Sequence, residues 1–334
     1  MPSAPVSLPT PASLPSPAPA DDLADPYVLA HYAGARPTAP AWFTAAIAHQ
    51  PERGRFVSQG AEIELLTWGE AGKPGLLFLH GNGAHADWWS PLAPFFAGQW
   101  RCGALSWSGM GRSDRRAEGY DVTLFAQEAR DAIAAARLDE AGPCMVIGHS
   151  FGGMVGLFAA ASNPAVRGLV VIDSPLGMSR ERVDVVRARA PRAYPAHRPF
   201  ATIADGLARF RLSPPQPCVN DFMADHIARH GLVEENGAWV WHFDPRRVTM
   251  RKNALAPPVA DVACPIAYLH GDRSTLINAE TLATTRAALP PETPFITIPD
   301  SAHHVPLDQP LALVAALRAL LATWPAPGQG WPHR

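Results

Sequence analysis

Short runs of branched and apolar residues recur along the chain and are separated by stretches long enough to form helices. They occupy residues 76–80, 102–107, 144–148, 168–173, 265–270 and 295–299. Continuous apolar runs of this length are typical of parallel strands that are buried on both faces. The pattern therefore predicts an α/β fold in which helices cover both sides of a mostly parallel sheet.

Helical periodicity is clearest in two segments. Residues 123–139 begin with Thr123 as a plausible N-cap, and their apolar positions recur at helical intervals. Residues 310–323 begin with Pro310, which suits the first turn of a closing C-terminal helix. Residues 55–69 alternate between polar and apolar, which predicts an antiparallel pair at a sheet edge.

Between residues 175 and 262 prolines, arginines and helical pieces replace strands. We interpret this region as a lid inserted into the core. The expected organisation is a disordered Pro/Ala-rich segment, the first part of the core, the lid, the second part of the core and a tail, over residues 1–25, 26–174, 175–262, 263–324 and 325–334. Within the lid, Trp239, Trp241 and Phe243 share one side if extended. They either line a substrate cavity or pack the lid down.

Composition narrows the class of protein. The 334 residues are 47% hydrophobic and 17% charged, with a net charge of −2. Such a balance leaves no broad basic face, so we expect no nucleic-acid partner. We also expect no membrane span and no secretory signal. The four cysteines have neither paired nor metal-type spacing, so the chain is expected to be a reduced, cytoplasmic protein without a metal.

The segment CMVIGHSFGGMVGLFAAA carries a candidate nucleophile. Gly148, Ser150 and Gly152 match the pattern G-x-S-x-G, preceded by a strand-like run and followed by an Ala/Gly-rich helix. A tight turn between strand and helix forces backbones together, which requires small residues two before and two after the serine. The Ser150 hydroxyl then lies at the positive end of a helix, where a developing oxyanion is favoured.

The sequence resembles the α/β-hydrolase superfamily over roughly residues 55–323. LLFLHGNGAHADWW is similar to its oxyanion loop, which implies that the backbone N–H groups of Asn82 and Phe151 form the oxyanion hole. SGMGRSD is similar to a turn after the fourth strand, and IPDSAHHVPLDQP to the histidine loop. Counting back from Pro310 selects His303 over His304. The resemblance implies an eight-stranded, mostly parallel sheet with a helical cap after strand 6. His149, His85 and Asp87 are interpreted as structural or pocket-lining.

The third member of the triad is less obvious. The superfamily usually carries its acid as Gly-x-x-Asp after the seventh strand, where this chain has Gly271 followed by Asp272, Arg273 and Ser274. Asp173 ends the strand after the nucleophile's helix, so its carboxylate is expected at the same sheet edge as Ser150. We expect Asp173 to be the acid, with Asp272 as the alternative.

A serine nucleophile with a histidine base suits acyl transfer at an ester, lactone or thioester carbonyl of a small, largely apolar substrate, without a cofactor. Dehalogenation is disfavoured, because attack by serine on saturated carbon forms an ether, which has no carbonyl at which water could release the product. Carbon–carbon bond hydrolysis and a non-catalytic, ligand-binding member of the fold are the alternatives.

Overall fold

The computed structural model describes residues 27–161, 163–177, 198–244, 258–326 and 329–331. The expected disordered segment 1–25 and parts of the expected lid and tail lie outside the described residues. The strands of the main sheet are β1 (Glu52–Ser58), β2 (Ala61–Trp68), β3 (Gly75–Leu79), β4 (Arg101–Leu105), β5 (Cys144–His149), β6 (Val166–Ile172), β9 (Ile266–Gly271) and β10 (Phe295–Ile298).

These strands form one eight-stranded sheet in the order β1-β2-β4-β3-β5-β6-β9-β10. From β4 to β10 all neighbours are parallel, whereas β2 is antiparallel to both β1 and β4. This confirms the predicted α/β-hydrolase fold, including the antiparallel pair at the edge. The carboxyl ends of the parallel strands meet along one side of the sheet, where sites form in open α/β sheets.

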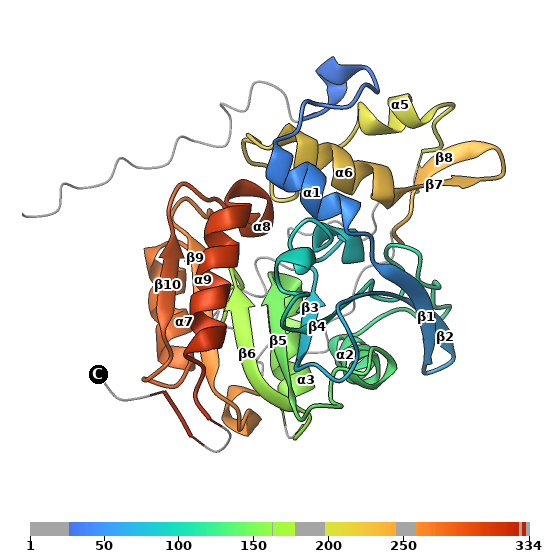
Figure 1. Cartoon of the computed structure of the whole chain (residues 1–334). Coiled ribbons are helices and arrows are strands. Elements are labelled where there is room, and N and C mark those ends of the chain that lie inside the picture. The colour runs from blue at the N-terminus through green and yellow to red at the C-terminus, as the bar shows by residue number, and fades with distance from the viewer. Residues whose placement is uncertain (1–26, 162, 178–197, 245–257, 327–328, 332–334) are drawn as a thin grey trace, which may run out of the picture.

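Helices cover both faces of the sheet (Figure 1). One apolar cluster packs α2 (Val122–Ala135) and α3 (Phe151–Ala160) against it, and α7 (Ala279–Ala288) lies beside this cluster. A second cluster packs α9 (Pro310–Ala322) and the 3₁₀ segments η3 (Ala86–Trp88) and η4 (Ala93–Phe95) on the other face. The short helix α8 (Val305–Asp308) leads into α9 and adds Val305 to the same cluster.

The predicted helix over residues 123–139 is present, but its ends differ from the prediction. The N-cap is Asp121, whose carboxylate accepts a hydrogen bond from the Leu124 N–H over 2.8 Å. Thr123 instead donates its hydroxyl to Asp121. The helix ends at Ala135, because Arg137 has a φ of 59° and turns the chain toward β5. Asp121 thus caps the helix by accepting the N–H three residues later, as aspartate at an N-cap commonly does.

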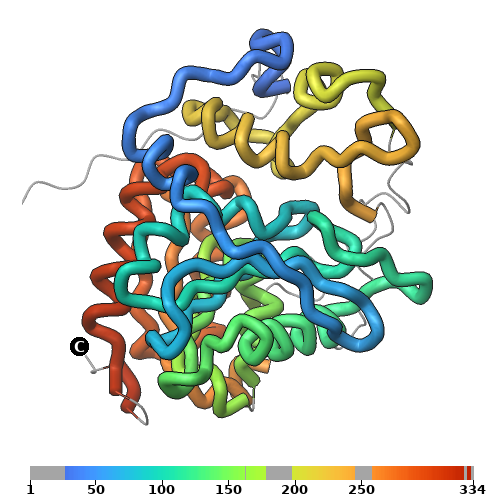
Figure 2. Tube along the Cα trace, turned by 45° about the vertical axis from the view of Figure 1, so that its right-hand side comes forward, coloured from blue at the N-terminus to red at the C-terminus, as the bar shows by residue number. Residues whose placement is uncertain are grey.

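A separate layer lies over the carboxyl edge of the sheet (Figures 1 and 2), and we call it the roof. It combines residues 198–244 with residues 27–48. The first segment contains α5 (Ile203–Leu207), α6 (Asp221–Gly231) and the hairpin of β7 (Leu232–Glu235) and β8 (Ala238–Trp241), and the second contains η2 (Ala30–Tyr32) and α1 (Ala41–Ala48). Leu29 and Phe43 share an apolar cluster with Met223 and Ile227 of α6. The N-terminal segment is thus part of the cover over the sheet edge.

Polar contacts join the roof to the sheet side of the molecule. His226 of α6 lies with its Nε2 2.7 Å from Ser90 Oγ, and Gln216 donates from its side-chain amide to the Asp308 carboxylate over 2.8 Å. Across the described residues no helix combines the length and the apolarity that crossing a membrane requires. The four cysteines are free thiols.

Candidate active site

Ser150 occupies the sharp bend between β5 and α3, with φ 54° and ψ −119°. This conformation is strained for a non-glycine residue and is held by close packing around it. A Cβ added at Gly152 would collide with the backbone carbonyl of Leu79, and one at Gly148 would collide with the backbone of Gly152. The small residues on both sides of Ser150 are therefore required by backbone contact, as the sequence pattern predicts for such a bend.

His303 and Asp173 meet at the same edge of the sheet. Asp173 follows β6 with a φ of 49°, and its Oδ1 lies 2.7 Å from His303 Nδ1. Both side chains are buried. The His303 Nδ1–H therefore donates to the carboxylate, which leaves Nε2 as the basic nitrogen of the ring. His303 and Ser150 line one cavity without sharing a hydrogen bond, a contact that free enzymes often tighten only when substrate binds.

Ser274 donates its hydroxyl to Asp173 Oδ1 over 2.6 Å, and the Gly271 N–H donates to Oδ2 over 3.0 Å. The position where relatives usually carry the acid thus holds a donor that fixes the carboxylate of Asp173. Asp272 is exposed and accepts a hydrogen bond from the Ser301 N–H over 3.1 Å. The structure therefore brings Asp173, and not Asp272, to the histidine.

The two backbone groups expected to hold an oxyanion flank this cavity. Asn82 follows β3 and lines the cavity, and Phe151 is the first residue of α3, directly after Ser150. Among the described residues neither backbone N–H has a hydrogen-bond partner. The first N–H groups of a helix have no acceptor within the helix and are available to an anion.

The cavity has a volume of about 940 Å³ and lies between the sheet edge and the roof. Trp241 and Phe243 line it. Trp239 lies outside the lining and its backbone pairs with Phe200 of the roof instead. Of the three aromatic residues singled out in the sequence, two therefore line the cavity and one packs in the apolar cluster of the roof.

Sequence reasoning missed two arginines at the rim of the cavity. Arg209 and Arg211 are both exposed, and among the described lining residues there is no Asp or Glu. Arg209 stacks over the ring of Tyr27 at 5.1 Å, whereas Arg211 forms no ion pair within the described part of the chain. The alternation Arg-Phe-Arg gave only a weak signal, because Arg209 lies in the turn after α5 and the segment is not a strand.

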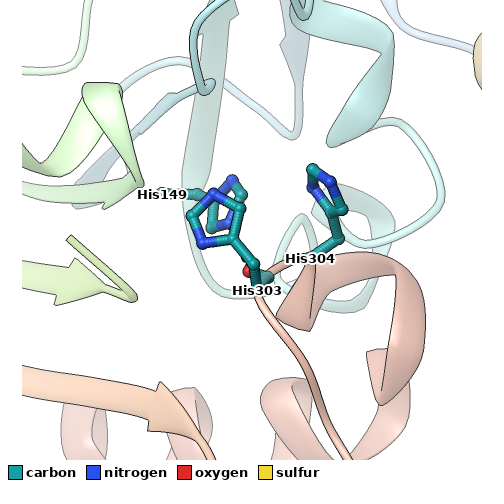
Figure 3. A group of neighbouring side chains, drawn as sticks. All are labelled: His149, His303 and His304. Carbon is teal, nitrogen blue, oxygen red and sulfur yellow. Dashed lines mark hydrogen bonds between the residues drawn. The ribbon is translucent and has the colours of Figure 1, made fainter. Parts of the chain in front are cut away.

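Two further histidines lie beside His303 in the cavity (Figure 3). His149 Nε2 lies 2.8 Å from the backbone oxygen of His303, and His304 Nε2 lies 3.3 Å from the backbone oxygen of Pro214. Burial lowers the pKa of His149 far below its usual value and lowers the pKa of His304 to about 3. Both rings are therefore neutral at ordinary pH, and each holds a neighbouring loop through one N–H.

A second buried polar group lies where η3 meets α6. Burial raises the pKa of the Asp87 carboxyl, but hydrogen bonds from Arg53 outweigh this and lower it to about 2. The closer Arg53–Asp87 contact is 2.6 Å. His85 donates toward the backbone oxygen of Ile227 in α6 at 3.0 Å. His85 and Asp87 thus lie at the junction of roof and sheet, and His85 also lines the cavity.

Comparisons with known proteins agree with this architecture. A family model described as the alpha/beta hydrolase family matches residues 76–317. The chain is 26% identical over 266 residues to 2-(acetamidomethylene)succinate hydrolase of Mesorhizobium japonicum, which covers 75% of this chain and 90% of that protein. It is 25% identical over 276 residues to the esterase Rv0045c of Mycobacterium tuberculosis, which covers 79% of this chain and 88% of the relative.

Solved structures show the same fold. The crystal structure of E-2-(acetamidomethylene)succinate hydrolase superposes with a TM-score of 0.68 at 22% identity, over 82% of this chain and all of the other. At this identity the likeness concerns the arrangement of the chain, while the chemistry depends on the side chains described above.

Proposed function

Because the chain belongs to the alpha/beta hydrolase family, we propose that it is a serine hydrolase that cleaves small carboxylic esters through an acyl-enzyme. The observation that carries the proposal is the 2.7 Å contact between Asp173 Oδ1 and His303 Nδ1 beside the strained bend at Ser150. This is the arrangement of an acid, a base and a nucleophile that acyl transfer uses. The Mycobacterium tuberculosis relative that is named as an esterase supports it.

In the proposed first half-reaction, His303 Nε2 accepts the proton of Ser150 as Oγ attacks the ester carbonyl. The resulting oxyanion is stabilised by the backbone N–H groups of Asn82 and Phe151. His303 then gives the proton to the departing alcohol, and the acyl group remains on Ser150. In the second half-reaction His303 activates a water that attacks the acyl-enzyme, releasing the acid and restoring Ser150.

The cavity supports a substrate with an apolar acyl group and a negatively charged end. The apolar part of the cavity lining includes Phe210, Leu212 and Trp241. Positive charge at the rim comes from Arg209 and Arg211. The described lining contains no carboxylate that would oppose an anion. The Mesorhizobium japonicum relative is named for hydrolysis of 2-(acetamidomethylene)succinate, which is consistent with this preference. Lactones, thioesters and carbon–carbon bonds are alternative substrates for the same groups.

A serine-directed fluorophosphonate tests the proposed function. The unchanged protein is expected to form one covalent adduct on Ser150 and to hydrolyse p-nitrophenyl butyrate, and Ser150→Ala is expected to do neither. Mass spectrometry of the intact protein measures the adduct. A protein that is folded by circular dichroism but is neither labelled nor active toward esters would show that the fold serves binding instead.

A further inference from the structure

The hydrogen bonds around His149, His303 and His304 leave one lone pair on each ring. His303 Nδ1–H donates to the Asp173 carboxylate, His149 Nε2–H to the backbone oxygen of His303, and His304 Nε2–H to the backbone oxygen of Pro214. The remaining nitrogens are His303 Nε2, His149 Nδ1 and His304 Nδ1. His304 Nδ1 is buried and has no hydrogen-bond partner.

The three rings converge from two elements. His149 ends β5, and His303 and His304 are neighbours in the loop before α8, as Figure 3 shows. One ring nitrogen of each residue lies within 4.8 Å of the others, and all three residues are buried. Metal–imidazole bonds of about 2.0–2.1 Å require these nitrogens to move closer together when an ion binds.

The surroundings of the rings match those of metal ligands. A histidine that binds a metal almost always donates its other N–H to a carboxylate or a backbone carbonyl, which fixes the tautomer. Here all three rings already make such a bond, one to Asp173 and two to backbone oxygens. Three imidazoles with an open fourth position favour Zn²⁺, Ni²⁺ or Cu²⁺ over Mg²⁺ and Ca²⁺, which prefer oxygen ligands.

We propose that His149, His303 and His304 form a binding site for a divalent late transition-metal ion, with Zn²⁺ as the representative, and that its occupation reversibly inhibits the enzyme. Coordination uses the lone pair of His303 Nε2, which is the base in the proposed function. A bound ion therefore prevents removal of the Ser150 proton while leaving the fold unchanged. The inhibition rests on the proposed function, whereas metal binding itself does not.

A second group of possible ligands is a weaker candidate. Asp87, His226 and His230 also bring ligand atoms within 4.8 Å of one another. However, the Arg53 guanidinium lies 2.6 Å from Asp87 and already neutralises its charge. His226 Nε2 is bonded to Ser90 Oγ. A cation there would have to displace Arg53, so this group serves as the matched control.

The experiment compares Zn²⁺ with Mg²⁺ on protein treated with a chelator and then freed of it. Calorimetry measures binding, and the rate of p-nitrophenyl butyrate hydrolysis measures inhibition, each variant being referred to its own rate without metal. His304→Gln is expected to weaken both binding and inhibition by about tenfold or more, the order seen when groups around a bound metal are removed. His149→Gln is expected to do the same, and His226→Gln to leave both unchanged.

Each outcome bears on the proposal. Equal Zn²⁺ affinity in the unchanged protein and in both folded variants, His304→Gln and His149→Gln, overturns it, as does loss of binding only in His226→Gln. Binding that follows His304 and His149 without any ester hydrolysis supports the metal site and contradicts the proposed function. Hydrolysis that Zn²⁺ and Mg²⁺ affect equally supports the proposed function and contradicts the metal site.

Discussion

At the scale of single residues, Ser274 supports the carboxylate of Asp173, which is the proposed acid of this site. The Asp173 carboxylate receives three donors, from His303, Ser274 and the Gly271 backbone. The donors fix the carboxylate in one orientation, and that orientation fixes the tautomer of His303. The hydroxyl of Ser274 is therefore a supporting group for the proposed acid, which directly follows β6.

Replacing Asp173 by Asn is expected to lower kcat for p-nitrophenyl butyrate by about 10⁴, as loss of the acid does in the worked serine-protease case. An amide presents an N–H to His303 or forces the other tautomer, so Nε2 no longer accepts the serine proton. Asp272→Asn is the matched control and is expected to leave kcat nearly unchanged, because Asp272 is bonded to the Ser301 backbone. A larger loss in Asp272→Asn would reverse the assignment.

Moving the acid back is a sharper test. In the Asp173→Asn background, Ser274→Asp places a carboxylate where the hydroxyl now lies within 2.6 Å of residue 173. We expect the double variant to recover at least about tenfold in kcat over Asp173→Asn, which corresponds to about 1.4 kcal/mol of transition-state stabilisation. Steady-state kinetics of the two variants measures it, and a double variant no faster than the single one argues against exchangeable positions.

Arg211 is expected to select substrates by charge. For the mono-p-nitrophenyl ester of a dicarboxylic acid, Arg211→Gln should lower kcat/KM by about fivefold, which corresponds to an ion pair worth about 1 kcal/mol at a partly exposed rim. The neutral ester of equal length should be little affected. Arg286→Gln is the control, because Arg286 lies in α7, stacks over Phe295 and does not line the cavity. Equal losses on both esters would contradict the preference.

Residue types and spacing were sufficient to predict the strained turn at Ser150 and to select His303 over His304. Both predictions depend on short stretches of sequence around the residue. They left two acids open, since the distance from a carboxylate to His303 depends on how β6, β9 and β10 lie together. Spacing gave no role to His149 and His304, because their convergence with His303 exists only after β5 and the histidine loop meet.

At the scale of elements, the bend between β5 and α3 is the most tightly constrained part of the site. Gly152 packs against the backbone of Leu79 in β3, so the helix start and two strands share one space. Backbone atoms have no freedom to move aside as flexible side chains do. The strain at Ser150 is therefore maintained by packing on the neighbouring strand.

Gly152→Ala is expected to lower the free energy of unfolding by about 2–3 kcal/mol, in the range of overpacked sites. Gly98→Ala is the matched control, because a Cβ there meets nothing within 4 Å, and its stability is expected to change little. Urea unfolding of both variants measures the difference. Equal stability of the two would mean that the bend relaxes at no cost.

Apolar runs predicted the strands well, because burial on both faces leaves a strong signal in the sequence. The start of α2 was predicted at Thr123, whereas Asp121 provides the cap. Both residues can cap a helix, and the choice depends on which side chain reaches the free N–H groups. Such competition between neighbours is set by the path of the chain before the helix, which periodicity does not report.

At the scale of the whole molecule, Asp308 links α8 to the roof. Burial raises the pKa of its carboxyl to about 6, although hydrogen bonds from Gln216 and Ala302 oppose the rise. Between about pH 4 and pH 6 the folded protein keeps a proton that the unfolded chain has released. The contribution to stability is therefore complete below pH 4 and is lost as the pH rises to about 6.

Asp308→Asn is expected to remove this dependence. The difference in unfolding free energy between the unchanged protein and the variant should shift by about 2 kcal/mol from pH 4 to pH 7, the order that a pKa change of this size implies. Urea unfolding across this pH range measures the shift, with Asp272→Asn as an exposed control. A difference that is the same at every pH would contradict the role of Asp308.

The parallel sheet was predictable for the molecule as a whole, but the composition of the roof was not. Residues 27–48 lack any strand-like run or motif that would assign them to a layer. Their partners are the apolar face of α6, nearly two hundred residues later, and that pairing is a tertiary choice.

The roof over Ser150 thus combines two stretches from distant parts of the sequence, residues 27–48 and 198–244. A polypeptide that began at Glu52 would retain every strand of the main sheet and every group of the proposed reaction, yet the apolar side of α6 that meets Leu29 and Phe43 would face water. We expect such a polypeptide to lose discrimination between ligands before it loses the capacity to cleave a bond, because the N-terminal segment contributes Tyr27 to the cavity wall and no group to the proposed reaction.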